Sequence, residues 1–233
     1  MSSFFALNAV LLTAASPWGI PVQVLAETTS SNDELLRLGE LEEQSAPASP
    51  GGTILFAERQ TAGRGQFARA WASGEPLGLW FSLLLRLEIS DATIPALSSF
   101  AAVALAETLE ELGFPDVRIK PPNDLYLAGR KVAGILVETR TGKNPFAVVG
   151  IGLNVNQRTE DFPTVLQPCA TSLALTSGCP AGSTLNRNEI AAVLLRCLAR
   201  NERLMRENPS ALLAAWNSLL IDPAILPVLP LIK

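Results

Sequence analysis

The segment of residues 61–78, TAGRGQFARAWASGEPLG, constrains the fold most, because it joins two apolar segments without offering a helix. Residues 63–68, GRGQFA, follow the strand-like GTILFAE and match the G-x-G-x-x-G/A spacing of a dinucleotide-binding fingerprint. That fingerprint needs a helix that begins at its third small residue. Gly74, Pro76 and Gly78 disfavour such a helix. Glu88 has roughly the spacing of the acidic residue that binds the ribose in such sites, but it directly follows the apolar LLLRL, with no helix between. The sequence therefore argues against a doubly wound dinucleotide-binding fold.

Without that helix, residues 61–71 are predicted to form a loop that suits an anion. Glycines flank Arg64, and Arg69 and Trp71 follow. Glycines allow backbone N–H groups to approach an anion closely, and a guanidinium group matches phosphate or carboxylate. A solvent-exposed hairpin loop is the alternative, and the loop by itself does not decide between the two.

The remaining pattern predicts a single α+β domain, a mixed β-sheet flanked by helices. Helical features mark residues 30–44, 97–113, 188–207 and a segment after Pro209. Strand-like segments cover 21–27, 53–58, 78–87, 116–120 and 146–156, and 124–140 resembles two strands joined near Ala128-Gly129. We expect Pro95 to precede the second helix and a polar loop to lead to the third.

Composition excludes several kinds of chemistry. The 233 residues include no histidine, which rules out Ser-His-Asp and Cys-His nucleophile systems and most zinc sites. The formal net charge of −4 gives no sign of a basic face, so no nucleic-acid partner is expected. Cys169, Cys179 and Cys197 lack metal-type spacing, and an odd number of cysteines fits a reducing compartment better than a disulfide framework.

The N-terminal segment MSSFFALNAVLLTAAS is apolar and allows two interpretations. A signal peptide needs a positive charge before its apolar stretch, and this segment has none. The segment is also too short to span a bilayer. We therefore favour a core helix or strand, a cytoplasmic location and no membrane association.

Three further segments share the polar character of the glycine-rich loop. KPPNDLY (120–126) sets polar groups around a Pro-Pro turn, RKVAGILVE (130–138) places a lysine at a strand start, and GIGLNVN (150–156) ends a strand in glycines and asparagines. Taken singly, they are also consistent with an ordinary turn, a solvated lysine and a tight turn.

Taken together and in order, the segments resemble the biotin–protein ligases. The resemblance rests on SSN, ERQTAGRG, K-x-PNDL, KVAGILVE and GIGLNVN, and runs from about Val22 to Trp216. It implies a catalytic domain related to class II aminoacyl-tRNA synthetases and lipoate ligases. The implied reaction converts biotin and MgATP to biotinyl-5′-AMP, then transfers biotin to a lysine of a biotin carboxyl carrier protein. The implied cofactors and substrates are thus ATP, Mg²⁺ and biotin.

The resemblance also implies roles for individual residues. Arg64 and Lys131 match the catalytic cations, and Asp124 matches a residue that could contact Mg²⁺. The implied biotin site comprises Ser30, Ser31, Asn32, Gln60, Gly63, Arg64, Gly65, Gln66, Lys131 and Gly134. The implied nucleotide site comprises Arg69, Trp71, Lys120, Asn123, Asp124, Asn154 and Asn156.

Departures from the family pattern mark where this chain should differ. Gln66 stands where relatives often have an arginine, and Ala68 stands where they have a glycine. Pro121 replaces the usual tryptophan before PND. By resemblance, residues 1–220 are expected to be the catalytic domain, without an N-terminal DNA-binding domain, and residues 221–233 stand where relatives begin a small C-terminal domain. Relatives include monomers and dimers, so a homodimer stays open. A lipoate or octanoate ligase or transferase, and a non-catalytic biotin-binding protein, are the alternatives.

Overall fold

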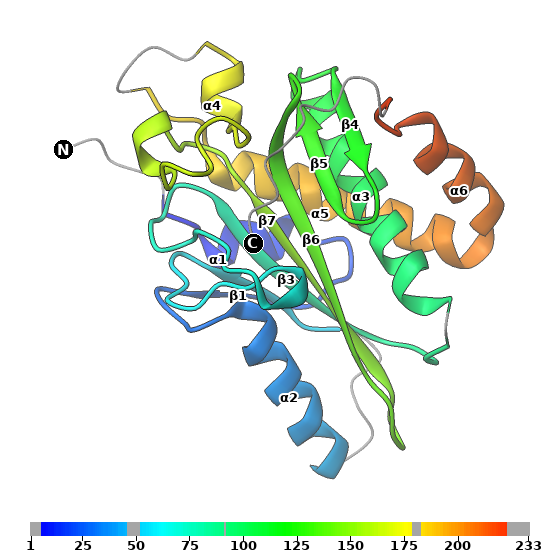
Figure 1. Cartoon of the computed structure of the whole chain (residues 1–233). Coiled ribbons are helices and arrows are strands. Elements are labelled where there is room, and N and C mark those ends of the chain that lie inside the picture. The colour runs from blue at the N-terminus through cyan, green and yellow to red at the C-terminus, as the bar shows by residue number, and fades with distance from the viewer. Residues whose placement is uncertain (1–5, 46–51, 91, 179–182, 223–233) are drawn as a thin grey trace.

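A seven-stranded mixed sheet forms the centre of the computed structural model, which describes residues 6–45, 52–90, 92–178 and 183–222 (Figure 1). The strand order is β1-β2-β3-β7-β6-β5-β4, and only β1 and β2 are parallel among these pairs. The strands are β1 (Val22–Leu25), β2 (Ile54–Ala57), β3 (Leu79–Arg86), β4 (Val117–Lys120), β5 (Asp124–Leu127), β6 (Arg130–Arg140) and β7 (Phe146–Leu153). This architecture confirms the predicted mixed sheet.

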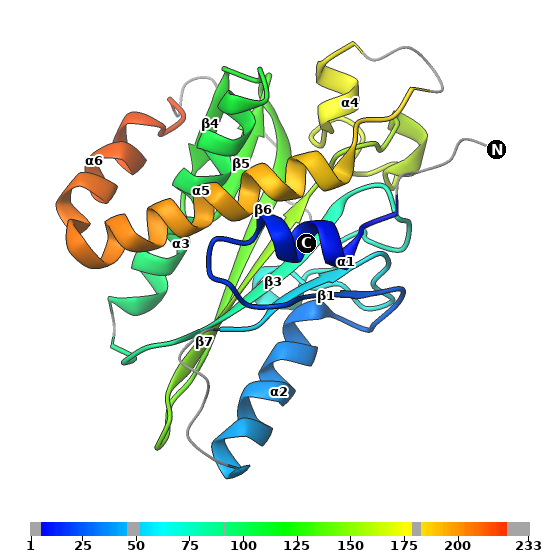
Figure 2. The same ribbon diagram turned by 180° about the vertical axis from the view of Figure 1, so that it is seen from behind.

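Helices cover the two faces of the sheet unequally. Helices α3 (Thr93–Glu111) and α5 (Arg187–Glu207) pack on one face, with α1 (Ala9–Ala15) and α6 (Pro209–Ser218) beside them, as the rear view shows (Figure 2). Helix α2 (Ser31–Ser45) packs on the opposite face against β3 and β7. The main core therefore lies beneath α3, and the other face is partly left to loops.

The side chains of β7 alternate between the two faces of the sheet, and this alternation determines what packs on each face. Ala147, Val149 and Ile151 point into the core beneath α3, whereas Phe146 and Val148 pack with the leucines of α2. Successive side chains of a strand point to opposite faces, so Gly150 and Gly152 continue the α2-side row. The sheet thus has a hydrophobic half under α2 and a row without side chains beyond it.

Most predicted elements are confirmed, with two corrections. Helix α3 begins at Thr93, so Pro95 lies inside its first turn, where the missing N–H costs no intrahelical bond. The predicted polar loop also contains α4 (Leu173–Thr176), whose Ser172 cap accepts a hydrogen bond from the Leu175 N–H.

The β5–β6 turn and the N-terminal helix agree with the predictions from the sequence. Positive φ angles at Ala128 and Gly129 close the predicted β5–β6 turn. Leu12 of α1 is buried, as a core helix requires. Within the described ranges, no helix has the length and apolar character needed to cross a membrane. Cys179 lies outside the described residues.

Candidate active site

Glycines on the α2 side of the sheet form the floor of the candidate site. Gly152 pairs with Trp80 on one side and Gly134 on the other, and Gly150 pairs with Ser82. A Cβ atom at Gly152 would lie 2.5 Å from the Trp71 indole, and one at Gly150 would lie 2.2 Å from Asn32 Oδ1. The floor therefore needs glycine, because other side chains already occupy the space above it.

A buried group that we call the polar cluster lies above this floor. It consists of Ser31, Asn32, Gln60, Ser73 and Ser82, each less than a tenth exposed. Gln60 Oε1 accepts from the Ser31 N–H at 2.8 Å, and Gln60 Nε2 donates to Ser73 Oγ at 3.1 Å. The Ser82 hydroxyl lies 2.7 Å from both Ser31 Oγ and Asn32 Oδ1. Two predicted segments and two unpredicted serines thus form one hydrogen-bonded network.

The predicted glycine-rich loop is a short hairpin beside the polar cluster. The Trp71 N–H donates to Gly63 O, and the Gly65 N–H donates to Arg69 O, both at 2.8 Å. One 3₁₀ turn, Gln66–Ala68, forms the tip and is followed by extended backbone. No helix begins at Ala68, which confirms that the loop is not a dinucleotide fingerprint. Phe67 at the tip is 87% exposed and has a φ of 56°.

Arg64 leaves this loop toward two carboxylates. It pairs with Asp33 of α2 and donates to both Glu138 oxygens at 3.3 Å. Burial lowers the pKa of Arg64, but the two carboxylates outweigh it, so the pKa is raised above its ordinary value. Arg64 is therefore a permanent cation fixed between α2 and β6.

A β-bulge places Lys131 on the same face. Leu125 pairs with Ala133 but Tyr126 pairs with Lys131, so Val132 is an extra residue of β6. Val132 and Ala133 both enter the core, and Lys131 falls on the site face. Its Nζ lies 2.6 Å from Asp124 Oδ1 and 5.3 Å from the ring centroid of Trp71. The sequence predicted this residue but not the bulge that orients it.

The predicted nucleotide-side residues are less closely grouped. The side-chain amides of Asn123, Asn154 and Asn156 donate to the carbonyls of Ile135, Thr171 and Leu185 at 2.7–3.0 Å, so they support neighbouring loops. Lys120 Nζ lies 3.4 Å from Tyr126 Oη, and Arg69 lies over the exposed Phe67 ring. Trp71, in contrast, lies between the glycine floor and Lys131.

Sequence comparison identifies the family. Residues 26–156, more than half of the chain, match the biotin/lipoate A/B protein ligase family. The chain belongs to this family. It is 37% identical over 206 residues to the biotin–[acetyl-CoA-carboxylase] ligase of Mycobacterium tuberculosis, covering 85% of this chain and 70% of that protein. This places it among the biotin–protein ligases of the family.

Other relatives are longer than the matched region. The chain is 39% identical over 157 residues to the bifunctional ligase/repressor BirA of Bacillus subtilis and 38% identical over 205 residues to that of Escherichia coli. These matches cover 66% and 86% of this chain, but only 47% and 60% of the relatives. The biotin protein ligase of Aquifex aeolicus in complex with biotin and ATP has a similar structure, with a TM-score of 0.68 and 30% identity over 86% of this chain and 78% of that one.

Sequence reasoning missed four polar residues of the candidate site. Ser73 and Ser82 complete the polar cluster, and Asp33 and Glu138 hold Arg64. Glu138 was visible as the last residue of KVAGILVE, and Asp33 directly follows SSN. Ser82 interrupts the apolar segment WFSLLL, and this single polar residue in a buried strand was the available signal.

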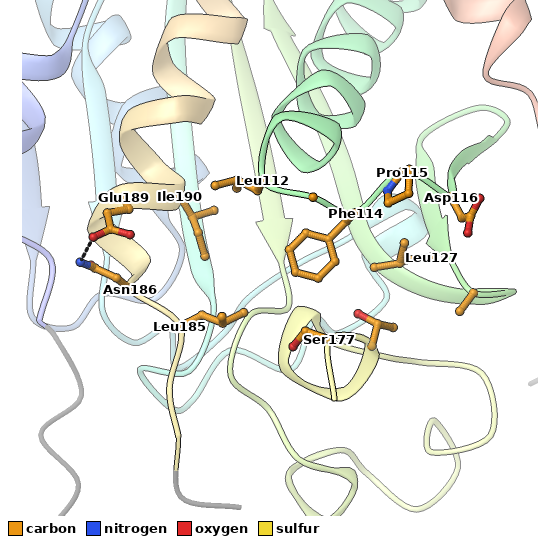
Figure 3. Close-up of a pocket in the computed structure, with 13 residues that line it drawn as sticks. Leu112, Phe114, Pro115, Asp116, Leu127, Ser177, Leu185, Asn186, Glu189 and Ile190 are labelled. Carbon is orange, nitrogen blue, oxygen red and sulfur yellow. Dashed lines mark hydrogen bonds between the residues drawn. The ribbon is translucent and has the colours of Figure 1, made fainter. Parts of the chain in front are cut away.

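A cavity of about 490 Å³ lies away from these residues (Figure 3). It is bounded by the end of α3, the β5–β6 turn and the start of α5, with Phe114, Leu185 and Ile190 in its wall. Its lining residues in the described part of the chain include Asp116 and Glu189 but neither lysine nor arginine. A nucleotide site needs cations for its phosphates, so this cavity is not the candidate site.

Proposed function

We propose that this chain activates biotin with ATP to form biotinyl-5′-AMP and then transfers biotin to a lysine of a biotin carboxyl carrier protein. One observation carries the proposal: the polar cluster, Arg64 and Lys131 meet on one face of the sheet. The similarity to the Aquifex aeolicus ligase in complex with biotin and ATP supports it.

The polar cluster suits the ureido ring of biotin, which presents both N–H donors and a carbonyl acceptor. Hydroxyl groups of Ser31 and Ser82 can donate or accept, and Gln60 and Asn32 offer both functions. The Trp71 Nε1–H is buried without a hydrogen-bond partner among the described residues and borders the glycine floor. A ligand acceptor beside Trp71 would satisfy this donor. Ser30, Gly63, Gly65 and Gln66 complete the proposed biotin side.

In the first step, a biotin carboxylate oxygen attacks the α-phosphorus of ATP, and the bond to pyrophosphate breaks. The carboxylate is already ionised at neutral pH, since its pKa is about 4–5, so no base is needed. The main requirement is fixed positive charge around the phosphates. We assign this role to Arg64 and Lys131, with Lys120, Arg69 and Trp71 on the nucleotide side. Asn123, Asn154 and Asn156 shape the loops there.

In the second step, a carrier lysine attacks the activated carbonyl and AMP leaves. The attacking amine must lose a proton, because its ordinary pKa is near 10.4. Asp124 is the nearest carboxylate to Lys131 that we assign to the site, and it is a candidate acceptor.

Among the described residues we find no resident magnesium site. Asp124 is already paired with Lys131, and the described part of the chain has no group of three or more Cys, Asp or Glu placed to hold a metal. Mg²⁺ would therefore enter with ATP as part of the substrate, held mainly by phosphates and water. The metal role of Asp124 stays a prediction.

A three-way assay tests the proposal. The purified protein is incubated with MgATP, a carrier domain and either biotin or lipoate, and the carrier is probed for modification. Modification with biotin supports the proposal. Modification with lipoate alone would select a lipoate ligase, and binding of biotin without turnover would select a non-catalytic protein. Fractionation tests the proposed cytoplasmic location, and sedimentation at assay concentration distinguishes a homodimer from a monomer.

A further inference from the structure

Glu138 connects the two halves of the proposed site, although it has no role in the chemistry described above. It lies on β6, and its side chain is 21% exposed. Its Oε2 accepts from Asn32 Nδ2 at 2.9 Å, while both its oxygens lie 3.3 Å from Arg64 nitrogens. The same carboxylate therefore contacts the polar cluster and the loop cation.

This contact fixes which way the Asn32 amide points. A carboxylate only accepts hydrogen bonds, so Asn32 must present its NH₂ group to Glu138. Asn32 Nδ2 also lies 3.4 Å from Leu136 O, a second acceptor on the same side. Asn32 Oδ1 is consequently directed at Ser82.

The amide orientation in turn assigns the single hydroxyl proton of Ser82. That hydroxyl lies 2.7 Å from both Asn32 Oδ1 and Ser31 Oγ. The Asn32 carbonyl oxygen has no proton, so Ser82 must donate for that bond to form. With the Ser82 proton directed at Asn32, Ser31 Oγ keeps lone pairs for a ligand N–H.

We propose that Glu138 is a positioning residue that sets the hydrogen-bond polarity of the polar cluster for the ureido group of biotin. This inference rests on the proposed function. Glu138 acts through Asn32 and Ser82 and does not touch the reacting atoms. Its Oε2 contacts both Asn32 Nδ2 and one Arg64 nitrogen, and its Oε1 contacts the other Arg64 nitrogen, so one carboxylate serves Asn32 and Arg64 at the same time.

The isosteric variant Glu138→Gln tests this role. The variant has one oxygen, so its NH₂ group replaces either Oε2, where it faces both Asn32 and Arg64, or Oε1, where it faces Arg64 alone. Either placement removes the negative charge that Asn32 faces, and the first placement favours a flipped Asn32 amide. With that flip, Ser82 would accept a hydrogen bond from the Asn32 amide and turn its proton to Ser31. Loss of a charge-assisted hydrogen bond corresponds to roughly a ten- to hundredfold effect. We expect the KM for biotin in pyrophosphate release to rise by about this factor, and kcat at saturating biotin to change much less.

Glu40→Gln is the matched control. Glu40 of α2 pairs with Arg140 of β6 at 2.8 Å, so this variant removes a glutamate–arginine ion pair outside the site, between the helix and the strand that carry Asn32 and Glu138. It should leave the KM for biotin unchanged. Equal increases in KM for the two variants would assign Glu138 a merely structural role and overturn the proposal.

A double-mutant cycle with Ser82→Ala supplies a second readout. Without the Ser82 hydroxyl there is no proton to direct, so Glu138→Gln should cost much less in this background than in the wild type. The same fold-increase in both backgrounds would overturn the inference, as would an unchanged KM for biotin in Glu138→Gln alone. Wild-type protein inactive with biotin and MgATP would instead refute the proposed function.

Discussion

Gly150→Ala should damage the biotin side of the site while leaving the fold intact. Gly150 lies on β7 beneath Asn32, where an added Cβ atom would come within 2.2 Å of Asn32 Oδ1 and 2.9 Å of its Cγ. Ordinary carbon contacts are about 3.5–4.0 Å, so Asn32 must move by roughly 1 Å. That shift separates Asn32 from Ser82, which lies 2.7 Å away, and from Glu138.

The expected cost follows from the packing. Inserting a methyl group into a filled site destabilises by about 1–3 kcal/mol. For a chain of this size each kcal/mol lowers Tm by about 2–4 °C, so Tm should fall by about 2–12 °C. Biotin affinity should fall at least about tenfold, which corresponds to about 1.4 kcal/mol. The loss of biotin affinity should be larger than the loss that the fraction of unfolded protein at 25 °C would cause.

Calorimetric titration with biotin and thermal unfolding measure the two effects. Gly74→Ala is the matched control, since a Cβ atom there meets no atom within 4 Å. It should change stability by less than about 0.5 kcal/mol and leave biotin affinity unchanged. Wild-type affinity in Gly150→Ala, together with a lowered Tm, would refute the assignment of Asn32 to the biotin site.

Three further predictions concern the cations and the only tyrosine. Lys131→Ala should lower adenylate formation at least about a hundredfold, because a fixed charge at the phosphates is lost, and near-normal pyrophosphate release would refute that role. Gln66→Arg should slow dissociation of the adenylate by adding a positive charge to the loop, and an unchanged or faster off-rate would contradict it. Burial, then Asp124, raises the pKa of Tyr126 to about 12, so ultraviolet titration of this sole tyrosine should show little tyrosinate in folded protein at pH 10–11. Because the folded-state pKa is raised, the free energy of unfolding should fall as pH rises from about 10 to about 12. Tyr126→Phe should remove that fall. A titration midpoint near 10 in the folded protein would contradict this prediction.

The order and type of the elements could be predicted from local chemistry. Continuous apolar segments such as TILFAE and GLWFSLLLRL correspond to β2 and β3, and Ala128-Gly129 closes the predicted turn. Gly74, Pro76 and Gly78 exclude a helix after the glycine-rich segment by local backbone physics, so the predicted loop is confirmed. Such features need no knowledge of distant residues.

The contacts that organise the site could not be predicted in this way. The bulge at Val132 depends on how β5 and β6 pair, and Glu138 reaches Asn32 across 106 positions of the chain. Ser82 reads as one polar residue in a buried strand until Asn32 is placed beside it. Long-range partners decide these roles, and a sequence pattern carries only the residue types.

The ion pairs around Arg64 and Lys131 would let the proposed site keep its cations without resisting an anionic ligand. Arg64 is paired with Asp33 and Glu138, and Lys131 with Asp124. All five side chains are at least 20% exposed, and pairs with this degree of exposure contribute only about 0–1 kcal/mol each. A phosphate that exchanges for Asp33 or Asp124 therefore loses little of its own binding energy. Of the three carboxylates, Glu138 is the least free to leave its cation, because it also accepts a hydrogen bond from Asn32. It can therefore keep the polar cluster ordered while the cations turn to the ligand.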